Sequence, residues 1–343
     1  MRRTMGSPTS TIERHFIDQQ AKHPEATGEL TRLMHQLAFA AKQITKEVRS
    51  AGLSDILGST GHTNVQGETV QKLDEISNDM IYRAMDHAGV LCCMASEERE
   101  KMIPIPSEFK YGKYTLAFDP LDGSSNIDAN INVGTIFSIH KRVSPDETPG
   151  TEEDLLQEGR KQVVAGYIVY GSSTMMVYTT GHGVDGFTLE PSLGEFLLSH
   201  PNMRMPNHGK YFSVNMGNYH FWSEGVKKYI DHVMTPDKEK GKPYSLRYIG
   251  SMIADVHRTL LYGGIFMYPL DRKDPSHPRG KLRLLYEASP MSMVVEQAGG
   301  LSSTGKQSIL DVLPTELHER VPLFVGSREN VEELLSFIKQ YDK

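Results

Sequence analysis

The feature that most constrains the fold of this chain is an apolar segment, residues 113–118, that runs directly into Asp119-Pro120-Leu121-Asp122-Gly123-Ser124-Ser125. The apolar run predicts a buried strand, and the proline fixes the turn that follows it. Two carboxylates and the carbonyl between them can present hard oxygens to Mg²⁺, which prefers oxygen ligands at about 2.0–2.1 Å. The N–H groups of the small residues that follow could converge on phosphate oxygens. The alternative is an Asp-capped surface turn, because Asp-Pro and Asp-Gly are common turn pairs.

Two further segments place acidic residues after predicted strands. Residues 90–95 end in Ser96-Glu97-Glu98, and residues 280–287 alternate basic and apolar side chains before Glu287 and a predicted helix. Lys281 and Arg283 would share one face of this second strand, which suits a phosphate group. An exposed acidic strand end and a solvated edge strand are the respective alternatives. With the first motif, these segments favour metal-assisted phosphate chemistry.

Length and composition limit the class of protein. A chain of 343 residues exceeds one ordinary core, so we expect two domains, residues 1–200 and 201–343, with the boundary in the Pro/Asn/Gly-rich stretch 201–209. The net charge of −6 argues against nucleic-acid binding. No segment reaches the roughly 18 apolar residues of a membrane span. Residues 6–10 are polar or small where a signal peptide would need an apolar run, so no signal peptide is predicted. The adjacent Cys92 and Cys93 form no disulfide framework, which predicts a reducing cytoplasm.

Apolar periodicity predicts mixed helices and strands. Helices are expected near residues 29–51, 74–88, 223–234, 251–261, 291–297 and 328–341, and residues 54–70 read as a mobile loop. Strands are expected at residues 90–95, 113–118, 135–139, 162–170, 175–180 and 264–268. This order predicts an α+β or layered α/β fold rather than a regular βαβ repeat.

Two glycine-rich motifs are not assigned a nucleotide-binding role. Gly181-His182-Gly183-Val184-Asp185-Gly186 fits a dinucleotide fingerprint, but a strand-like segment follows it where a helix is required. Residues 300–306 nearly complete a P-loop, but Gln307 replaces the Ser/Thr that would bind magnesium, and a predicted helix precedes the motif.

The chain resembles the class I fructose-1,6-bisphosphatases, in particular their bacterial branch. The 119–125 motif is the signature of the wider lithium-sensitive sugar and inositol phosphatase superfamily, and residues 247–252, 263–269 and 280–287 carry narrower motifs. An insertion around residues 145–158 and the presence of Asn218 resemble the bacterial proteins. The resemblance implies a sandwich of alternating helix and sheet layers (α/β/α/β/α). It also implies an N-terminal regulatory domain, a C-terminal sugar-phosphate domain and an active site at their junction.

The resemblance implies hydrolysis of the 1-phosphate of fructose 1,6-bisphosphate in gluconeogenesis, with two or three Mg²⁺ ions and Mn²⁺ as an alternative. The implied metal ligands are Glu97, Glu98, Asp119, the carbonyl of Leu121, Asp122 and Glu287. Asp74 and Glu98 match the pair that deprotonates the attacking water. The loop is expected to close over the site, and Glu68 stands there where the family often has Asp.

Substrate binding and assembly follow from the same resemblance. The implied sugar-phosphate residues are Asp122, Gly123, Ser124, Ser125, Asn215, Tyr219, Arg247, Tyr248, Met252, Tyr268, Lys281 and Arg283. In the family, the residue that matches Arg247 enters the site from a neighbouring subunit, so we expect a homotetramer. Asn218 shifts the local match to the family pattern at Tyr219.

The resemblance also implies AMP as an allosteric inhibitor. Its residues would be Thr27, Gly28, Glu29, Leu30, Thr31, Lys113, Tyr114 and Lys141. Lys141 replaces an Arg of the family and loses bidentate geometry, so weaker AMP binding is expected. An ordinary helix cap is the alternative reading of residues 27–31. Alternative functions are inositol-phosphate or sedoheptulose-1,7-bisphosphate hydrolysis and a catalytically silent nucleotide sensor. All the carboxylates are present, which argues against the sensor.

Overall fold

The computed structural model describes residues 10–20, 28–53, 56–63, 69–274, 276 and 278–342. Thr27 and Glu68, assigned above to nucleotide binding and to the loop, lie outside these residues. In the described part of the chain, none of the helices has both the length and the apolar character needed to cross a membrane.

An eight-stranded sheet occupies the N-terminal half, in the order β10-β9-β8-β7-β6-β5-β3-β4. Its strands are β3 (Leu91–Ser96), β4 (Ile103–Pro104), β5 (Tyr114–Asp122), β6 (Val133–Lys141), β7 (Gln162–Tyr170), β8 (Thr174–Thr179), β9 (Asp185–Glu190) and β10 (Glu195–His200). Among the described strands of this sheet, only β3 and β5 are parallel neighbours. Because parallel strands end at the same edge of a sheet, the acidic segments after β3 and β5 are brought together.

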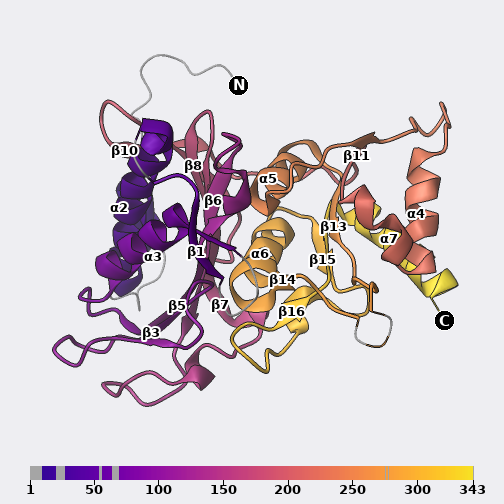
Figure 1. Cartoon of the computed structure of the whole chain (residues 1–343). Coiled ribbons are helices and arrows are strands. Elements are labelled where there is room, and N and C mark those ends of the chain that lie inside the picture. The colour runs from indigo at the N-terminus through magenta and orange to yellow at the C-terminus, as the bar shows by residue number, and fades with distance from the viewer. Residues whose placement is uncertain are drawn as a thin grey trace.

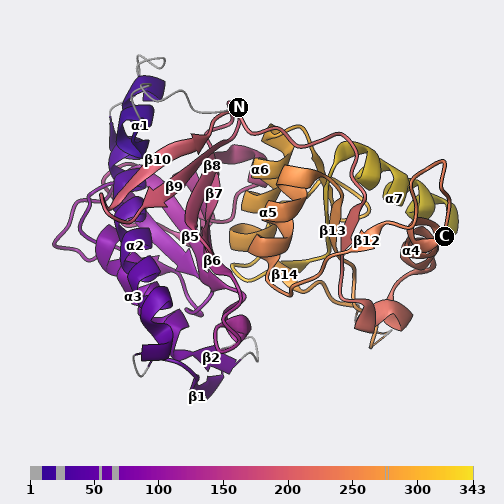
Figure 2. The same ribbon diagram turned by 90° about the horizontal axis from the view of Figure 1, so that it is seen from above.

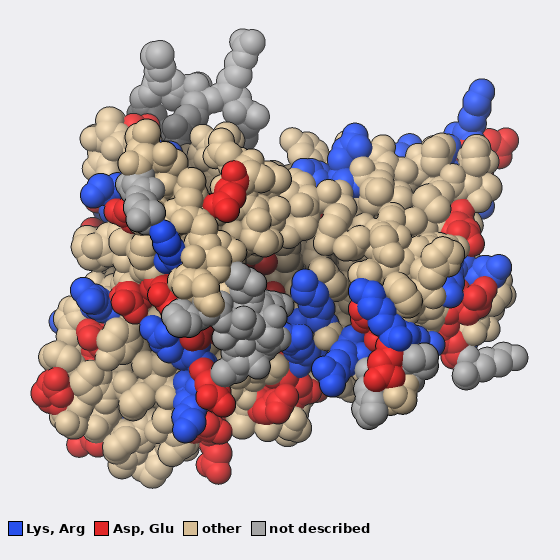
Figure 3. Space-filling view, in the orientation of Figure 1, with Lys and Arg blue, Asp and Glu red and all other residues tan. Residues whose placement is uncertain are grey.

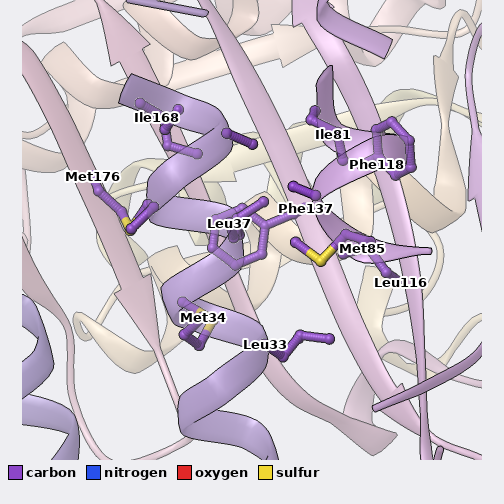
Figure 4. Close-up of a cluster of buried hydrophobic side chains, with 14 of the residues drawn as sticks. Leu33, Met34, Leu37, Ile81, Met85, Leu116, Phe118, Phe137, Ile168 and Met176 are labelled. Carbon is purple, nitrogen blue, oxygen red and sulfur yellow. The ribbon is translucent and has the colours of Figure 1, made fainter. Parts of the chain in front are cut away.

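Helices α1 (Ile12–Gln20), α2 (Glu29–Ser50) and α3 (Lys72–Met85) cover one face of this sheet (Figures 1 and 2). The predicted apolar stripe of α2 is buried, and Leu33, Met34 and Leu37 share a core cluster with Leu116 and Phe137 (Figure 4). Each such side chain contributes about 1.5–3 kcal/mol through burial. This packing fixes the strand that carries the first acidic motif.

A five-stranded sheet forms the C-terminal half, in the order β12-β11-β13-β17-β15. Its strands are β11 (Tyr211–Ser213), β12 (Ser245–Leu246), β13 (Ile265–Tyr268), β15 (Leu301–Ser303) and β17 (Leu323–Gly326). Helices α5 (Met252–Tyr262) and α6 (Ser289–Gln297) lie between the two sheets, and α4 (Glu224–Met234) and α7 (Arg328–Tyr341) cover the outer face (Figures 1 and 2). The predicted sandwich of alternating helix and sheet layers is confirmed.

Two local predictions were wrong. Residues 54–70, expected to be a loop, contain β1 (Ser59–Thr63), which pairs with β2 (Thr69–Gln71) in a two-stranded sheet. Residues 280–287 form only a two-residue strand, β14 (Leu282–Arg283), which pairs with β16 (Arg320–Val321) and runs into a π-helix, η6 (Leu284–Ala288). The strand expected after the Gly181–Gly186 motif is present as β9, which supports reading that motif as a turn.

Candidate active site

The ends of β5 and β3 position the first carboxylates. Ser96 and Phe118 are register partners, and the backbone N–H of Glu97 donates to the carbonyl of Phe118 at 3.2 Å. Glu97 and Asp119 therefore leave adjacent strands at the same level. The Asp119 Oδ1 atom accepts a hydrogen bond of 2.9 Å from the backbone N–H of Leu121, which fixes the turn between the two aspartates.

Glu287, from the third acidic segment, completes a cluster of carboxylates. Oxygen atoms of Asp119, Asp122 and Glu287 all lie within 4.8 Å of one another, and the three residues are buried. Glu287 is held by η6, where its Oε2 atom accepts a hydrogen bond of 2.6 Å from the backbone N–H of Arg283. Residues separated by more than 160 positions in sequence thus present their oxygens to a single point.

This cluster is electrostatically costly without a cation. Burial, together with the negative charges of Glu97, Asp122 and Glu287, raises the pKa of Asp119 well above its usual range. Burial also raises the pKa of Asp122 to about 7, although hydrogen bonds from Ile253 and Ser251 oppose the shift. Hard oxygen ligands in such a cluster suit a divalent cation, which would favour the ionised forms.

Arg283 supplies positive charge from within the chain. Its Nη2 atom lies 2.7 Å from Glu97 Oε1 and its Nη1 atom 3.6 Å from Glu287 Oε2, and the side chain is only 4% exposed. The sequence predicted Arg283 and Lys281 on one strand face. Instead, Arg283 is buried among the carboxylates, whereas Lys281 is exposed and its Nζ lies 5.7 Å from the centre of the Tyr268 ring.

The carboxylates form one side of a cavity of about 390 Å³. Most of the site residues predicted from the sequence line this cavity: Asp74, Glu97, Glu98, Asp119, Leu121, Asp122, Gly123, Ser124, Ser125, Tyr248, Met252, Tyr268, Lys281, Arg283 and Glu287. Asp74 is the third residue of α3, where its Oδ2 accepts a hydrogen bond of 2.9 Å from the N–H of Gln71 in a capping box. The structure therefore brings the two residues expected to deprotonate the attacking water into the same cavity as the expected metal ligands.

The turn after Asp122 is built by the start of α5. Ser251 Oγ and the N–H of Ile253 donate to Asp122 Oδ2 at 3.1 and 2.9 Å, so the helix N-terminus stabilises this carboxylate. Gly123 adopts a φ of +76°, and a Cβ there would lie 2.8 Å from Ser251 Cβ. The short helix Ser124–Asn126 then begins beside the cavity.

Sequence reasoning missed several of the residues around this cavity. Gln71, Gly250, Phe266 and Leu282 also line it. Ser251 was expected only as the start of a helix. A serine preceding a helix is a signal for a cap, but its actual partner, Asp122, lies 129 positions away and could not be inferred from spacing.

Three predicted substrate residues do not line this chain's own cavity: Asn215, Tyr219 and Arg247. The Tyr219 hydroxyl donates to Asp231 Oδ1 at 2.8 Å. Arg247 is exposed, donates from Nη1 to the carbonyl of Leu246 at 3.0 Å and lies 5.7 Å from the centre of the Tyr211 ring. By contrast, Tyr248 lines the cavity, and burial with the neighbouring Tyr268 raises the pKa of its hydroxyl.

The residues expected to bind AMP form a separate group at the start of α2. Gly28 precedes the helix with a φ of +81°, and Lys113 Nζ lies 3.5 Å from Glu29 Oε2. Tyr114 and Lys141 are register partners on β5 and β6, so they lie side by side. Leu30 packs against the main core cluster, and Thr31 is the third residue of the helix.

Charged side chains of both signs are interspersed on the face shown in Figure 3. The basic side chains gathered toward the centre of that view lie next to acidic ones. A buried carboxylate cluster that lines a cavity in a layered α/β fold can hold a divalent cation, as metal-assisted phosphate hydrolysis requires.

Comparison with known proteins identifies the family. Residues 10–201 match the model of the fructose-1,6-bisphosphatase N-terminal domain, and residues 205–339 match that of its C-terminal domain. The chain belongs to the fructose-1,6-bisphosphatase family and is a phosphoric monoester hydrolase. A divalent metal requirement goes with this family, and the acidic cluster fits it.

Individual relatives agree over nearly the whole chain. Class 1 fructose-1,6-bisphosphatase of Maridesulfovibrio salexigens is 56% identical over 330 residues, which cover 96% of this chain and 98% of that protein. The enzyme of the same name from Chloroherpeton thalassium is 58% identical over 322 residues, covering 94% and 91%. The holo form of Leishmania major fructose-1,6-bisphosphatase superposes with a TM-score of 0.89 at 43% identity, covering 97% and 100%. A T-state structure of the same protein gives 0.84 at 42% identity, covering 96% and 99%.

Proposed function

We propose that this cavity hydrolyses the 1-phosphate of fructose 1,6-bisphosphate, giving fructose 6-phosphate and inorganic phosphate as a step in gluconeogenesis, with Mg²⁺ as the cofactor. The observation that carries the proposal is the convergence of Asp119, Asp122 and Glu287, which line the cavity with oxygen atoms within 4.8 Å of one another. Family membership and the names of the relatives support the substrate.

Glu97, Glu98, Asp119, the Leu121 carbonyl, Asp122 and Glu287 would hold two or three Mg²⁺ ions, which supply Lewis acidity and charge neutralisation when bound. Mn²⁺ is an alternative ion for the same oxygens. The N–H groups and hydroxyls of Gly123, Ser124 and Ser125 bind oxygens of the 1-phosphate. Asp74 and Glu98 take the proton of the attacking water, as general bases within the cavity.

The other end of the sugar bisphosphate is bound along β13 and the start of β14. Lys281, Tyr248 and Tyr268 line that side, and Met252 packs beside them. Lysine at this position provides a mobile charge for the 6-phosphate. Arg283 is different, because its contacts with Glu97 and Glu287 give it the role of holding the metal-binding carboxylates in place.

The experiment that tests the reaction compares phosphate release from fructose 1,6-bisphosphate, sedoheptulose 1,7-bisphosphate and inositol phosphate, with and without Mg²⁺. Asp119→Asn should lose activity by orders of magnitude while keeping its circular dichroism spectrum. Asp18→Asn, which breaks an exposed i,i+4 pair with Arg14, is the matched control and should keep full activity. Near-normal magnesium-dependent turnover of Asp119→Asn would refute the assignment.

We also propose a homotetramer built as a dimer of dimers, in the cytoplasm, in which Arg247 completes a neighbour's 6-phosphate pocket. The exposure of Arg247 and its position away from its own cavity support this arrangement. Arg247→Ala should raise KM with little change in kcat, because a remote binding contact is lost. Sedimentation showing a fully active monomer at assay concentration would contradict the proposal.

AMP is proposed as an allosteric inhibitor bound near the start of α2. Backbone N–H groups at a helix start can hold a phosphate, and Lys113 and Lys141 provide positive charge there. In the present structure Lys113 pairs with Glu29, so AMP binding would exchange that partner for the nucleotide phosphate. Lys113→Ala should relieve AMP inhibition without loss of uninhibited activity. An unchanged rate of the native enzyme in millimolar AMP would refute this assignment.

A further inference from the structure

We propose that Cys92, Cys93, Asp154 and the carbonyl of Thr151 form a second metal site, separate from the catalytic cavity, that binds one thiophilic divalent cation of the Zn²⁺ class. The ion would fasten residues 143–157, here called the strap, to strand β3. The active-site reaction uses none of these four groups.

A distortion of β3 places both thiols on one side. Consecutive residues of a regular strand point to opposite faces. In β3, however, Leu91 pairs with Tyr114 and Cys93 pairs with Thr115, so two residues advance against one and Cys92 is the extra residue of a bulge. Bulges re-aim side chains. As a result, Cys92 and Cys93 belong to the same buried cluster, beneath Leu155 of the strap.

The distances match a tetrahedral ion. Cys92 Sγ lies 3.9 Å from Cys93 Sγ and 3.9 Å from Asp154 Oδ2, and Cys93 Sγ lies 3.7 Å from the carbonyl oxygen of Thr151. Two thiolates at about 2.3 Å from a tetrahedral zinc ion are about 3.8 Å apart, and a thiolate and a carboxylate oxygen are about 3.5 Å apart. The distances from Cys92 Sγ to Cys93 Sγ and to Asp154 Oδ2 therefore exceed the tetrahedral values by only about 0.1 and 0.4 Å, and all three ligand atoms lie within 4.8 Å of one another.

Asp154 is positioned as a ligand would be. Its Oδ1 accepts hydrogen bonds from the N–H groups of Val143 and Ser144 at 2.8 and 2.7 Å, which orient the carboxylate. Oδ2, the proposed ligand atom, accepts from Ser144 Oγ at 2.7 Å and from the N–H of Thr151 at 2.8 Å, so the ion would replace its contact with the Cys92 thiol hydrogen. Burial opposes its ionisation, but hydrogen bonds from Ser144, Thr151 and Val143 outweigh that effect and lower the pKa of the carboxyl. Hydrogen-bonded carboxylates of this kind are typical of metal sites.

The thiols lose their protons when the ion binds. The hydrogen bond with Cys92 and, to a smaller extent, burial raise the pKa of the Cys93 thiol. The metal-free pair of cysteines therefore carries at least one proton. A bound divalent cation deprotonates a coordinating thiol, and the protons pass to solvent without any change of oxidation state. Affinity should consequently rise with pH.

The surroundings favour a cation. The strap carries Asp146, Glu147, Glu152 and Glu153 on its exposed surface, and these charges attract positive ions. Thr151, whose carbonyl faces Cys93, is itself exposed, so the site lies one residue below solvent. Arg142 is the nearby opposing charge, but its guanidinium donates to the carbonyls of Gly112 and Thr148 at 3.2 and 3.0 Å.

Cobalt spectroscopy tests the site, because thiolate-to-cobalt charge transfer is absent when only oxygen ligands bind the ion. We would load Co²⁺ into Asp119→Asn, whose catalytic cluster is weakened, both in the native state and during refolding. One equivalent should give a charge-transfer band by at least one route, and Zn²⁺ should displace it. Zn²⁺ at 100-fold above Kd should also raise the melting temperature by roughly 5 °C.

Variants assign the band to these residues. Cys93→Ser and Cys92→Ser, each in the Asp119→Asn background, should lose the band and the zinc-dependent shift in melting temperature. Glu153→Gln, an exposed strap variant that keeps all four ligands, should retain both. Absence of a charge-transfer band after both loading routes would overturn the proposal, whether or not the cysteine variants fold. A band that persists in both cysteine variants would overturn it as well.

Discussion

Arg283→Met tests how the chain balances the charge of its own active site. The substitution keeps an unbranched side chain but removes the buried guanidinium that lies 2.7 Å from Glu97 Oε1 and 3.6 Å from Glu287 Oε2. Asp119 and Asp122 are buried beside these carboxylates. Removing one partner of a buried ion pair typically costs about 3–5 kcal/mol, because the remaining charge is left uncompensated.

The expected loss depends on the metal. In EDTA, the free energy of unfolding of Arg283→Met should fall by about 3–5 kcal/mol relative to the native chain. With saturating Mg²⁺ the difference should shrink, because the vacated carboxylates bind the cation more tightly and binding to the folded state stabilises it. The Arg283 guanidinium and a bound Mg²⁺ ion would thus both neutralise the same carboxylates.

Urea denaturation followed by circular dichroism, with and without Mg²⁺, measures both quantities. Arg14→Met is the matched control, because it breaks an exposed i,i+4 pair with Asp18 and should cost only about 0.3–0.5 kcal/mol in either buffer. A loss below about 1 kcal/mol for Arg283→Met in EDTA would refute the reasoning. So would a large loss that Mg²⁺ leaves unchanged.

Three further outcomes follow from the structure. Gly123→Ala should lower stability by about 1–3 kcal/mol and raise KM, since φ is +76° and the new Cβ would meet Ser251; an unchanged melting temperature would contradict this. Burial lowers the pKa values of His140 and His257 to about 4, so the unfolded state binds more protons below its own pKa of about 6.5. Each histidine therefore leaves the free energy of unfolding undiminished above that pH. Between pH 7 and 5 each one lowers that free energy by about 2 kcal/mol. His140→Gln should flatten this slope in urea titrations, and an unaltered slope would count against the burial argument. Deleting part of residues 59–67 should reduce turnover sharply while sparing thermal stability, and normal turnover would show that the segment is not needed for catalysis.

Local patterns indicated the acidic segments around the cavity, whereas the set of expected metal ligands came from the family resemblance. Glu97 follows β3 and Asp119 and Asp122 lie at the end of β5, two parallel neighbours whose ends meet at one edge of the sheet. Glu287 reaches the cluster from η6, which the sequence did not predict. Other features of the site depend on packing between distant segments. They are the hydrogen bond from Ser251 to Asp122 and the position of Gln71 at the cavity. No periodicity or spacing in a single sequence reports such contacts.

The two incorrect predictions have separate physical causes. Residues 54–70 are rich in Gly, Ser and Thr, which favours a loop, yet β1 and β2 pair there because backbone hydrogen bonds do not require apolar side chains. In residues 280–287 the alternation of basic and apolar side chains favours a strand, but pairing with β16 ends after Leu282 and Arg283. A π-helix follows, and such helices are too rare to be expected from composition.

That early end of β14 decides what Arg283 does. Had the strand continued, Lys281 and Arg283 would both have faced the substrate, as the alternation indicated. Because η6 begins at Leu284, Glu287 is turned back so that its carboxylate accepts the N–H of Arg283, and the guanidinium is enclosed with Glu97 and Glu287. Lys281, which immediately precedes β14, remains exposed beside Tyr268. Two basic side chains of similar sequence context therefore have different partners: Lys281 lies over the Tyr268 ring at the cavity, and Arg283 pairs with Glu97 and Glu287.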